Sequence, residues 1–329
     1  MFVDLSTAQA WFDTLGQDKQ YPTASPEYIQ LEAMQSSARR AVFYLCVEQA
    51  EFYYLAGYLT HTEQGLIDFE TPRGYGGVIT NVTDPKKLAH LGQACTSDFA
   101  KRGVLCGFIR TIPALQNHCQ MPGDSWFDRR TVAIDLAVPD LLDSYQTRAR
   151  TAIRKSRKEY VCVKQATSLQ EWLAFFELYQ RRMSELNATQ EYLYDSDYFT
   201  ALSDSALATL YLAYRDGQVL AGCIVLQAGS FAEYHLSAST KDGMKYACTQ
   251  ACVHFAAQAC QTRGVKLMHL GGGLSNDEKD PLFFFKAGFS ELHLDFNISR
   301  WIFDSAAYEA LRAQYQAAGK LADRVIFYR

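Results

Sequence analysis

Apolar runs of strand length alternate along this chain with segments of helical periodicity. In the first half, residues 41–48 and 51–60 are rich in aromatic and β-branched side chains and flank a short polar turn, which predicts a β-hairpin. Apolar side chains at three- and four-residue spacing predict a helix over 84–102, and residues 104–109 predict a buried strand. A further helix is predicted to begin at Pro139.

The second half carries stronger turn signals. Asp216 and Gly217 lie between the apolar runs 208–214 and 219–227, a pattern typical of a tight hairpin. The elements predicted there are a strand, a helix, a three-strand meander, a helix, a strand, a short helix and a last strand, at 161–165, 169–186, 208–239, 244–263, 265–270, 280–288 and within 291–303.

The stretch 265–289 joins a glycine break to a lysine in a short aromatic helix. The three glycines at 271–273 end a buried strand and let a ligand approach the backbone closely. Asp280 suits a helix N-cap and Pro281 the first helical position. Lys286 lies among phenylalanines, where its ammonium either stabilises a developing negative charge or reaches from an apolar core to water. The sequence leaves both interpretations open.

Residues 71–77, TPRGYGG, place three glycines and a proline around one arginine and one tyrosine. One interpretation is a tight turn or bulge between strands, with Tyr75 packing outside it. The other is a backbone-lined cradle for an anion or a sugar beside Arg73 and Tyr75.

Residues 147–158, TRARTAIRKSRK, form the most basic stretch of the chain and contain no acid. Arg150, Arg154, Arg157 and Lys158 fall on one face of the predicted helix. Guanidinium groups bind phosphate oxygens bidentately, so this face suits a phosphorylated ligand. The alternative is a solvated face near a helix C-terminus, where cations are favoured. We expect the domain boundary in or just after this helix.

Composition narrows the possible classes of function. The 329 residues have a net charge of -4 and a pI near 6.0, so nothing global favours DNA or a membrane surface, and any anion site must be local. No run is long enough for a membrane span, and the N-terminus lacks the features of a signal peptide, so we expect a cytoplasmic protein. The nine cysteines are scattered without zinc spacing, which predicts reduced thiols and no metal site.

Five segments, taken in order, resemble motifs of one known family. The element order of the second half is similar to the acyltransferase fold of the Gcn5-related N-acetyltransferase (GNAT) superfamily. The segments resemble its FemABX branch, the peptidoglycan-bridge aminoacyltransferases. They are 71–77 (TPRGYGG), 150–158 (RTAIRKSRK), 234–239 (YHLSAS), 269–273 (HLGGG) and 280–289 (DPLFFFKAGF).

The resemblance implies an α+β (α/β) chain of two tandem GNAT-like acyltransferase domains, with mixed, mostly antiparallel sheets flanked by helices. The first domain would span 1–150, on the acceptor side, and be completed by 306–329. The second, 151–305, would carry the transfer site. The implied activity moves an aminoacyl group from charged transfer RNA, or an acyl group from acyl-coenzyme A, onto a primary amine of a phosphorylated cell-envelope precursor in peptidoglycan or polysaccharide biosynthesis.

The resemblance also implies roles for particular residues. Lys286 and the backbone at Phe285 would stabilise the tetrahedral oxyanion, and His235, Asp280 and Glu233 are the nearby titratable groups that could take the proton. No metal and no permanently bound cofactor is implied. The expected substrate contacts are Arg73, Tyr75, Arg150, Arg154, Lys155, Tyr234, Gly271, Gly272 and Gly273.

The segment 240–245, TKDGMK, departs from the superfamily pattern. It stands where the coenzyme A pyrophosphate loop, Q/R-x-x-G-x-G/A, is expected, and it lacks the first Gln or Arg and the last small residue. The departure disfavours a coenzyme A dependent N-acetyltransferase acting on an amino sugar or metabolite, which stays as the second hypothesis. A third hypothesis is a non-catalytic protein that binds a phosphorylated precursor.

Overall fold

The computed structural model describes all of residues 1–329. They form two units, each with its own strands and hydrophobic core. Unit 1 holds Met1–Lys19, Thr23–Arg129 and Asp295–Arg329, and unit 2 holds Gln20–Pro22 and Arg130–Leu294. These limits differ from the predicted boundaries at residues 150 and 305. The basic helix belongs to unit 2 because Ala149 and Ile153 are buried in its core with Val253 and Ala256.

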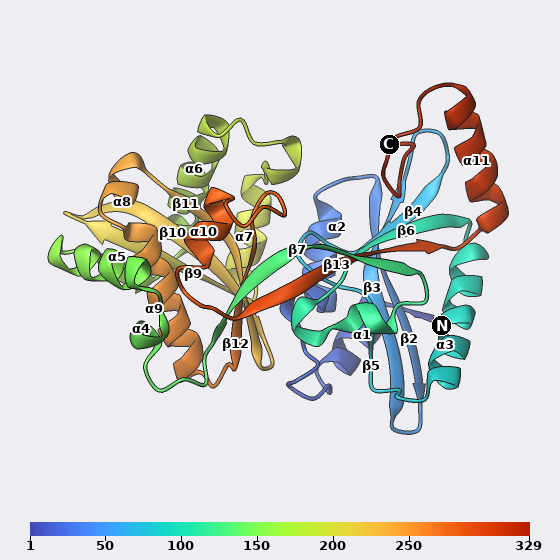
Figure 1. Ribbon diagram of the computed structural model, residues 1–329, viewed down its shortest axis with the longest axis horizontal. Helices are drawn as coiled ribbons and strands as arrows, with labels where there is room; N and C mark the ends of the chain where they lie inside the picture. Colours follow the sequence, from blue (N-terminus) through green and yellow to red (C-terminus); the bar gives the residue numbers. More distant parts are fainter. The chain divides into compact units, whose positions relative to one another are not determined.

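Unit 1 is a twisted sheet with helices against it (Figure 1). Its core is aromatic, and the ring of Phe99 stacks on that of Phe303 with centroids 4.7 Å apart. Its elements are β1 (Phe2–Val3), α1 (Leu5–Phe12), α2 (Pro26–Met34), β2 (Arg39–Glu48), β3 (Glu51–His61), β4 (Ile67–Glu70), β5 (Ile79–Thr80), α3 (Pro85–Ala100), β6 (Val104–Arg110), the first half of β7 (Asp124–Asp135), most of β13 (His293–Ile302) and α11 (Ser305–Ala317).

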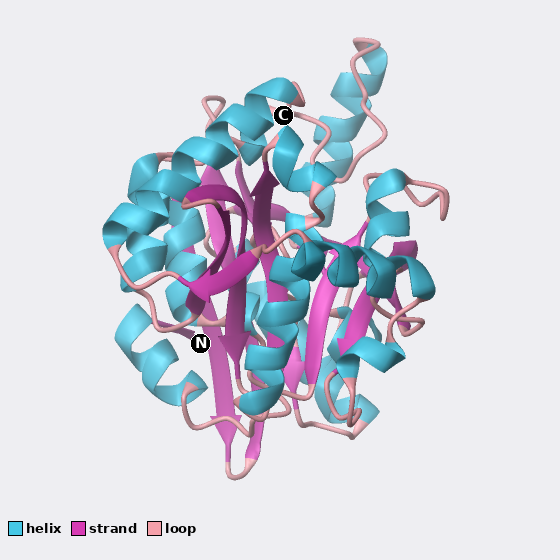
Figure 2. Ribbon diagram, turned by 90° about the vertical axis from the view of Figure 1, so that its left-hand side faces the viewer, coloured by secondary structure: helices cyan, strands magenta, loops and turns pink.

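Unit 2 has helices on both faces of its sheet, drawn in cyan in Figure 2. Side chains alternate along the central strands as a period of two requires. Tyr211 and Cys223 face helix α9, whereas Gly222 faces Phe175 of α6 on the other side. The elements are α4 (Leu141–Ser144), α5 (Thr147–Lys158), β8 (Cys162–Gln165), α6 (Leu169–Glu185), α7 (Ser196–Asp204), β9 (Ala208–Arg215), β10 (Gln218–Ala228), β11 (Phe231–Ser239), α8 (Lys241–Lys245), α9 (Cys248–Thr262), β12 (Leu267–Gly272) and α10 (Pro281–Lys286).

The two units repeat one topology although the sequence shows no internal repeat. In unit 1 the antiparallel meander β2, β3, β4 is followed by α3 and by β6, which pairs parallel to β4. In unit 2 the meander β9, β10, β11 is followed by α9 and by β12, which pairs parallel to β11. Each sheet thus has one parallel pair among antiparallel ones, which confirms the predicted mixed, mostly antiparallel fold.

The strand that completes each sheet comes from outside its contiguous segment. Thr131 to Asp135 of β7 pair with β12 in unit 2, although β7 follows β6 of unit 1 in the chain. Ile298 to Ile302 of β13 pair with β6 in unit 1, although β13 follows α10 of unit 2. The last strand predicted for the second half therefore exists, but most of it serves the other unit.

The structure differs from the sequence pattern at three places. The helix expected from Pro139 is broken at Tyr145, whose backbone is extended (ψ 156°) because its ring is buried against Phe289 and His254. Helix α7 lies in a tyrosine-rich segment for which no helix was predicted. The end of the chain, 324–328, forms no strand, although Ile326 and its neighbours are buried against β6.

Asn117, which is 1% exposed, holds the segment after β6 to the loop after β4. Its Oδ1 accepts from the N–H of Ile112 at 2.7 Å, and its Nδ2 donates to the carbonyls of Gly76 and Val78 at 2.9 and 3.0 Å. One side chain thereby satisfies three buried backbone groups, none of which belongs to a regular ladder.

Replacing Asn117 with Ala should lower the free energy of unfolding by about 2–4 kcal/mol, because three backbone groups would stay buried without partners. Urea unfolding followed by circular dichroism measures the loss. Asn276→Ala, at an exposed loop position, is the control and should change the midpoint little. Equal stability of the two variants would contradict the role given to Asn117.

Candidate functional site

The two parallel strands of unit 2 separate at a fork. β11 and β12 pair only from Phe231 to Glu233 and from Leu267 to His269. Beyond that point β11 stays with β10, and β12 continues antiparallel to β7 as far as Gly272. Backbone groups and side chains past the fork are therefore not covered by the neighbouring strand.

Both strands are irregular where they part. In β12 the register shifts between His269 and Gly271, and Gly271 takes a φ of 76° that favours glycine. In β11 an extra residue, His235, stands between the partners of Val225 and Ile224. Bulges of this kind redirect side chains and often accompany functional sites.

Helix α10 brings Lys286 to the glycine end of β12. Pro281 starts the helix, and Asp280 caps it by accepting from the N–H groups of Leu282 and Phe283 at 2.8 and 3.0 Å. Lys286 ends it, only 8% exposed, and its Nζ donates to the carbonyl oxygen of Gly272 at 2.8 Å. Phe285 packs edge-to-face against Phe289, which anchors the turn that carries the ammonium.

The carboxylate oxygens of Asp280 accept hydrogen bonds from backbone N–H groups. Its Oδ2 also accepts from the N–H of Leu274 at 3.0 Å, and a Cβ at Gly273 would lie 2.6 Å from its Oδ1. Burial acts to raise the pKa of this carboxyl, but the backbone N–H groups that it accepts from outweigh burial and hold the pKa below its usual value. Gly273 is thus required by the close approach of the cap.

His269 is fully buried, with a partner on each ring nitrogen. Tyr21 Oη lies 3.0 Å from its Nδ1, and Thr131 Oγ1 lies 2.8 Å from its Nε2. Because the Thr131 hydroxyl donates its only proton to the carbonyl of Leu294, it accepts from Nε2–H, and Tyr21 donates to Nδ1. Burial, reinforced by the Lys286 charge, lowers the pKa of His269 to about 3, so the ring is neutral.

The two candidate residues of β11 face opposite sides of the sheet. Tyr198 Oη on α7 lies 2.8 Å from Nε2 of His235, and the ring of Tyr194 stacks on Tyr198. Tyr234 instead packs into the core beside Cys223, and burial raises the pKa of its phenol. His235 is therefore the more accessible of the two to chemistry in the fork.

Arg73 and Tyr75 lie in unit 1, in the loop after β4. The Tyr28 hydroxyl donates to the carbonyl of Arg73 at 3.0 Å, and the Thr23 hydroxyl donates to the carbonyl of Tyr75 at 2.7 Å. Gly74 and Gly77 have φ values of 107° and 95°. The loop is a tight turn fixed through its backbone, and both candidate side chains are half-buried.

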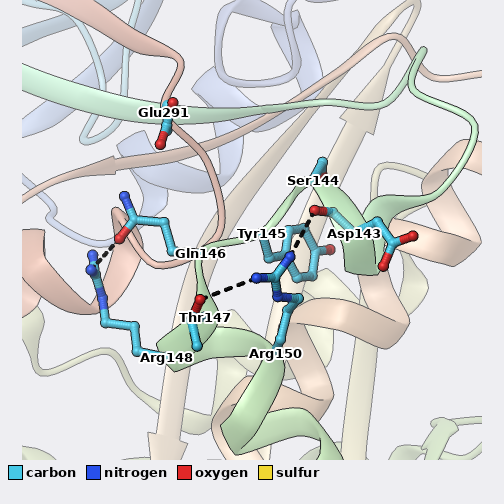
Figure 3. A pocket seen from close by; sticks show the side chains of 8 residues that line it. All are labelled: Asp143, Ser144, Tyr145, Gln146, Thr147, Arg148, Arg150 and Glu291. Carbon is cyan, nitrogen blue, oxygen red and sulfur yellow. Dashed lines mark hydrogen bonds between the residues drawn. The ribbon is translucent and has the colours of Figure 1, made fainter.

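The basic side chains of helix α5 differ in their surroundings. Arg154 and Lys155 are exposed along the helix. Arg150 lies at its start, where its guanidinium donates to the Asp143 carbonyl and to Thr147 Oγ1 (Figure 3). There it lines an open pocket of about 650 Å³ with Arg148, Gln146 and Glu291 among the other walls.

Hydrogen bonds within the turn after β11 engage its own backbone N–H groups. Thr240 Oγ1 accepts from the N–H of Gly243 at 2.9 Å, and the Thr240 carbonyl accepts from Met244 at 3.0 Å. A Cβ at Gly243 would lie 2.3 Å from the carbonyl oxygen of Leu220, so the turn is pressed onto β10. Two of its N–H groups are thus engaged within the turn itself.

The structure brings the candidates Lys286, Phe285, Asp280 and Gly271 to Gly273 together at one end of β12, and the fork adds His235. Sequence reasoning missed the partners of His269, Tyr21 and Thr131. A polar residue inside the apolar run 265–270 was the available signal for His269. No helix is long and apolar enough to cross a bilayer, and no group of three or more His, Cys, Asp or Glu side chains is arranged to hold a metal.

Comparisons with known proteins agree with this architecture. Residues 143–280 match the family model of the acetyltransferase (GNAT) domain. The crystal structure of FemX aligns over 94% of this chain and 99% of its own, with 13% identity and a TM-score of 0.74. The C-terminal domain of a candidate lysylphosphatidylglycerol synthetase from Agrobacterium fabrum aligns over 95% of both chains, with 12% identity and a TM-score of 0.57.

L-PGS from Bacillus licheniformis aligns over 96% of both chains, with 11% identity and a TM-score of 0.56. No relative is found among curated protein sequences. At these identities the solved structures show a shared fold. Residues 143–280 thus carry a GNAT domain, as predicted, and the predicted FemX-like fold is confirmed.

Two buried neutral histidines should make stability depend on pH. Burial and the Arg157 charge lower the pKa of His254 to about 4, and that of His269 is about 3. The unfolded chain binds a proton at each near pH 6.5, so stability is complete above that pH and is lost as the pH falls toward 4. Below pH 6 the slope should approach about 1.4 kcal/mol per pH unit for each histidine.

Urea unfolding between pH 7 and 5 measures this slope. His254→Gln keeps an amide facing Arg157 and should remove about half of it. His90→Gln, at an exposed position, is the control and should leave the slope as in the unchanged protein. Identical slopes in both variants would refute the assignment of His254 as a buried neutral group.

Proposed function

We propose that this chain, which carries a GNAT acyltransferase domain at residues 143–280 within a FemX-like fold, is an N-acyltransferase acting on a peptidoglycan or surface-glycan precursor. A primary amine of the acceptor attacks the carbonyl carbon of an activated acyl ester or thioester. The tetrahedral intermediate then loses a proton from nitrogen and expels the donor's alcohol or thiol, which leaves an amide.

One observation carries this proposal: a nearly buried ammonium beside an open fork. Lys286 is held at the end of β12 by its bond to Gly272, and the fork leaves the adjoining backbone uncovered by β11. A preorganised cation in a poorly hydrated site stabilises the oxyanion of acyl transfer more strongly than the neutral ground state.

The proton acceptor is best sought on β11. Asp280 is a weak base because its oxygens accept from backbone N–H groups, so we assign it to capping α10. His269 has a pKa of about 3 and both ring nitrogens engaged, which suits a positioning role. His235 stands on the bulge past the fork, so we favour it over Asp280 as the group that takes the proton from the amine.

For the donor we favour aminoacyl-tRNA over acyl-coenzyme A. The turn after β11 uses the N–H groups of Gly243 and Met244 internally, where coenzyme A binding would need donors for a pyrophosphate. The name of the Agrobacterium fabrum protein refers to a lysyl group, which is an aminoacyl group. The exposed cations of α5, including Arg154 and Lys155, suit a phosphate backbone.

The acceptor is proposed to carry phosphates, which the guanidinium of Arg150 would contact at the start of α5. Arg73 and Tyr75, in unit 1, stay predicted substrate contacts. Tyr234 would act through packing, since its phenol lies in the core.

Replacing Lys286 with Ala should lower kcat by about 100- to 1,000-fold, because the transition state would lose its charged donor. The rate of amide formation, followed by mass spectrometry, measures the effect. Lys266→Ala, an exposed lysine at the start of the same strand region, is the matched control and should retain full turnover. Near-normal turnover of a folded Lys286→Ala protein would rule out the proposed site.

A donor competition tests the proposed co-substrate. The protein is incubated with precursor extract and either charged transfer RNA or acetyl-coenzyme A, with Lys286→Ala as the blank. We expect the aminoacyl ester to be consumed and the thioester to remain. Consumption of acetyl-coenzyme A would instead support the N-acetyltransferase hypothesis, and precursor binding by calorimetry without consumption of either donor would support a binding protein.

A further inference from the structure

The last turn of α10 leaves one backbone carbonyl without a helical partner. The N–H groups of Ala287, Gly288 and Phe289 donate to the carbonyls of Phe283, Phe285 and Lys286. In a regular helix Gly288 would donate to Phe284, so the carbonyl of Phe284 must find a donor elsewhere. It accepts from Nη2 of Arg148 on α5 at 3.1 Å.

We propose that Arg148 is a positioning residue for Lys286, so that the basic helix α5 acts partly by fixing the catalytic helix rather than by binding substrate. The inference rests on the proposed function and deepens it. Arg148 touches neither the reacting atoms nor, in this assignment, the acceptor's phosphates. It acts through the backbone of the turn that carries Phe285 and Lys286.

The guanidinium holds α10 by two independent contacts. Besides its bond to the Phe284 carbonyl, its Cζ lies 4.1 Å above the centre of the Phe284 ring. That ring is 55% exposed and has little other packing to order it. A cation at a helix C-terminus is also favoured by the helix dipole.

Arg148 is itself fixed. Its Nη1 donates to Oε1 of Gln146, as Figure 3 shows, and the N–H of Gln146 donates to the carbonyl of Gly288 at 2.9 Å. Space is tight, because a Cβ at Gly288 would lie 3.3 Å from Nε of Arg148 and 3.0 Å from the carbonyl of Phe285. The start of α5 and the end of α10 therefore form one clamp.

The clamp matters because the reach of Lys286 depends on where α10 ends. Its ammonium meets Gly272 through a side chain attached to the last helical residue. A displacement of about 1 Å at such a position can cost on the order of a hundredfold in rate. Loosening the clamp should therefore lower turnover without weakening substrate binding.

The test compares Arg148→Ala with Arg148→Lys. In Arg148→Ala we expect kcat to fall by about ten- to a hundredfold, with the KM of each substrate changed by less than about twofold. Hydrogen exchange of the amides at 284–289 should become faster, while exchange in α6 stays the same. Lysine keeps the charge but lacks the planar fork, so Arg148→Lys should recover only part of kcat. Arg181→Ala, on the exposed side of α6, is the control.

Two results would overturn the inference. A raised KM with unchanged kcat, growing with ionic strength, would mean that Arg148 binds a phosphate of the substrate. Unchanged exchange at 284–289 would mean that the clamp does not order the helix, and this measurement needs no substrate. Failure of the proposed function has a different signature, namely full turnover in Lys286→Ala, which leaves the exchange result standing.

Discussion

A buried ammonium must be held by polar groups, and in this protein that requirement shapes the end of β12. The carbonyl of Gly272 meets Lys286 at 2.8 Å because the chain bulges at Gly271, with a positive φ, and turns this carbonyl toward α10. Gly273 leaves room for the Asp280 cap, which begins the helix that carries the lysine. The glycine break and the helix are thus two halves of one cation site.

The charge of Lys286 also constrains the protonation state of the buried side chain of His269. A second cation there would be costly, and His269 is accordingly neutral, with Tyr21 and Thr131 fixing its tautomer. The site therefore contains one strong positive charge on a rigid support. Electrostatic stabilisation of an oxyanion depends on such rigidity, because donors that must reorganise lose much of their effect.

Much of the fold and of the cation site could be predicted from short sequence patterns. The Asp216-Gly217 turn, the Asp280 cap and the glycine break each depend on interactions within a few residues. Their residue types therefore indicate the backbone conformation directly. The exchange of β7 and β13 could not be predicted, because a strand's own residues do not specify which unit supplies its partner. Nor could the bond between Tyr21 and His269, which joins residues 248 positions apart. The cation run of α5 indicated charge but not that Arg148 points inward to α10.

The exchanged strands have a consequence for how the protein is made. The sheet of unit 1 lacks β13 until the ribosome has released residue 302, although all of its other strands precede residue 130. The edge of β6 that will pair with β13 therefore stays unpaired while the whole of unit 2 is synthesised. Open strand edges are prone to pairing with other chains, so this order of synthesis calls for rapid completion of unit 2 or protection by a chaperone.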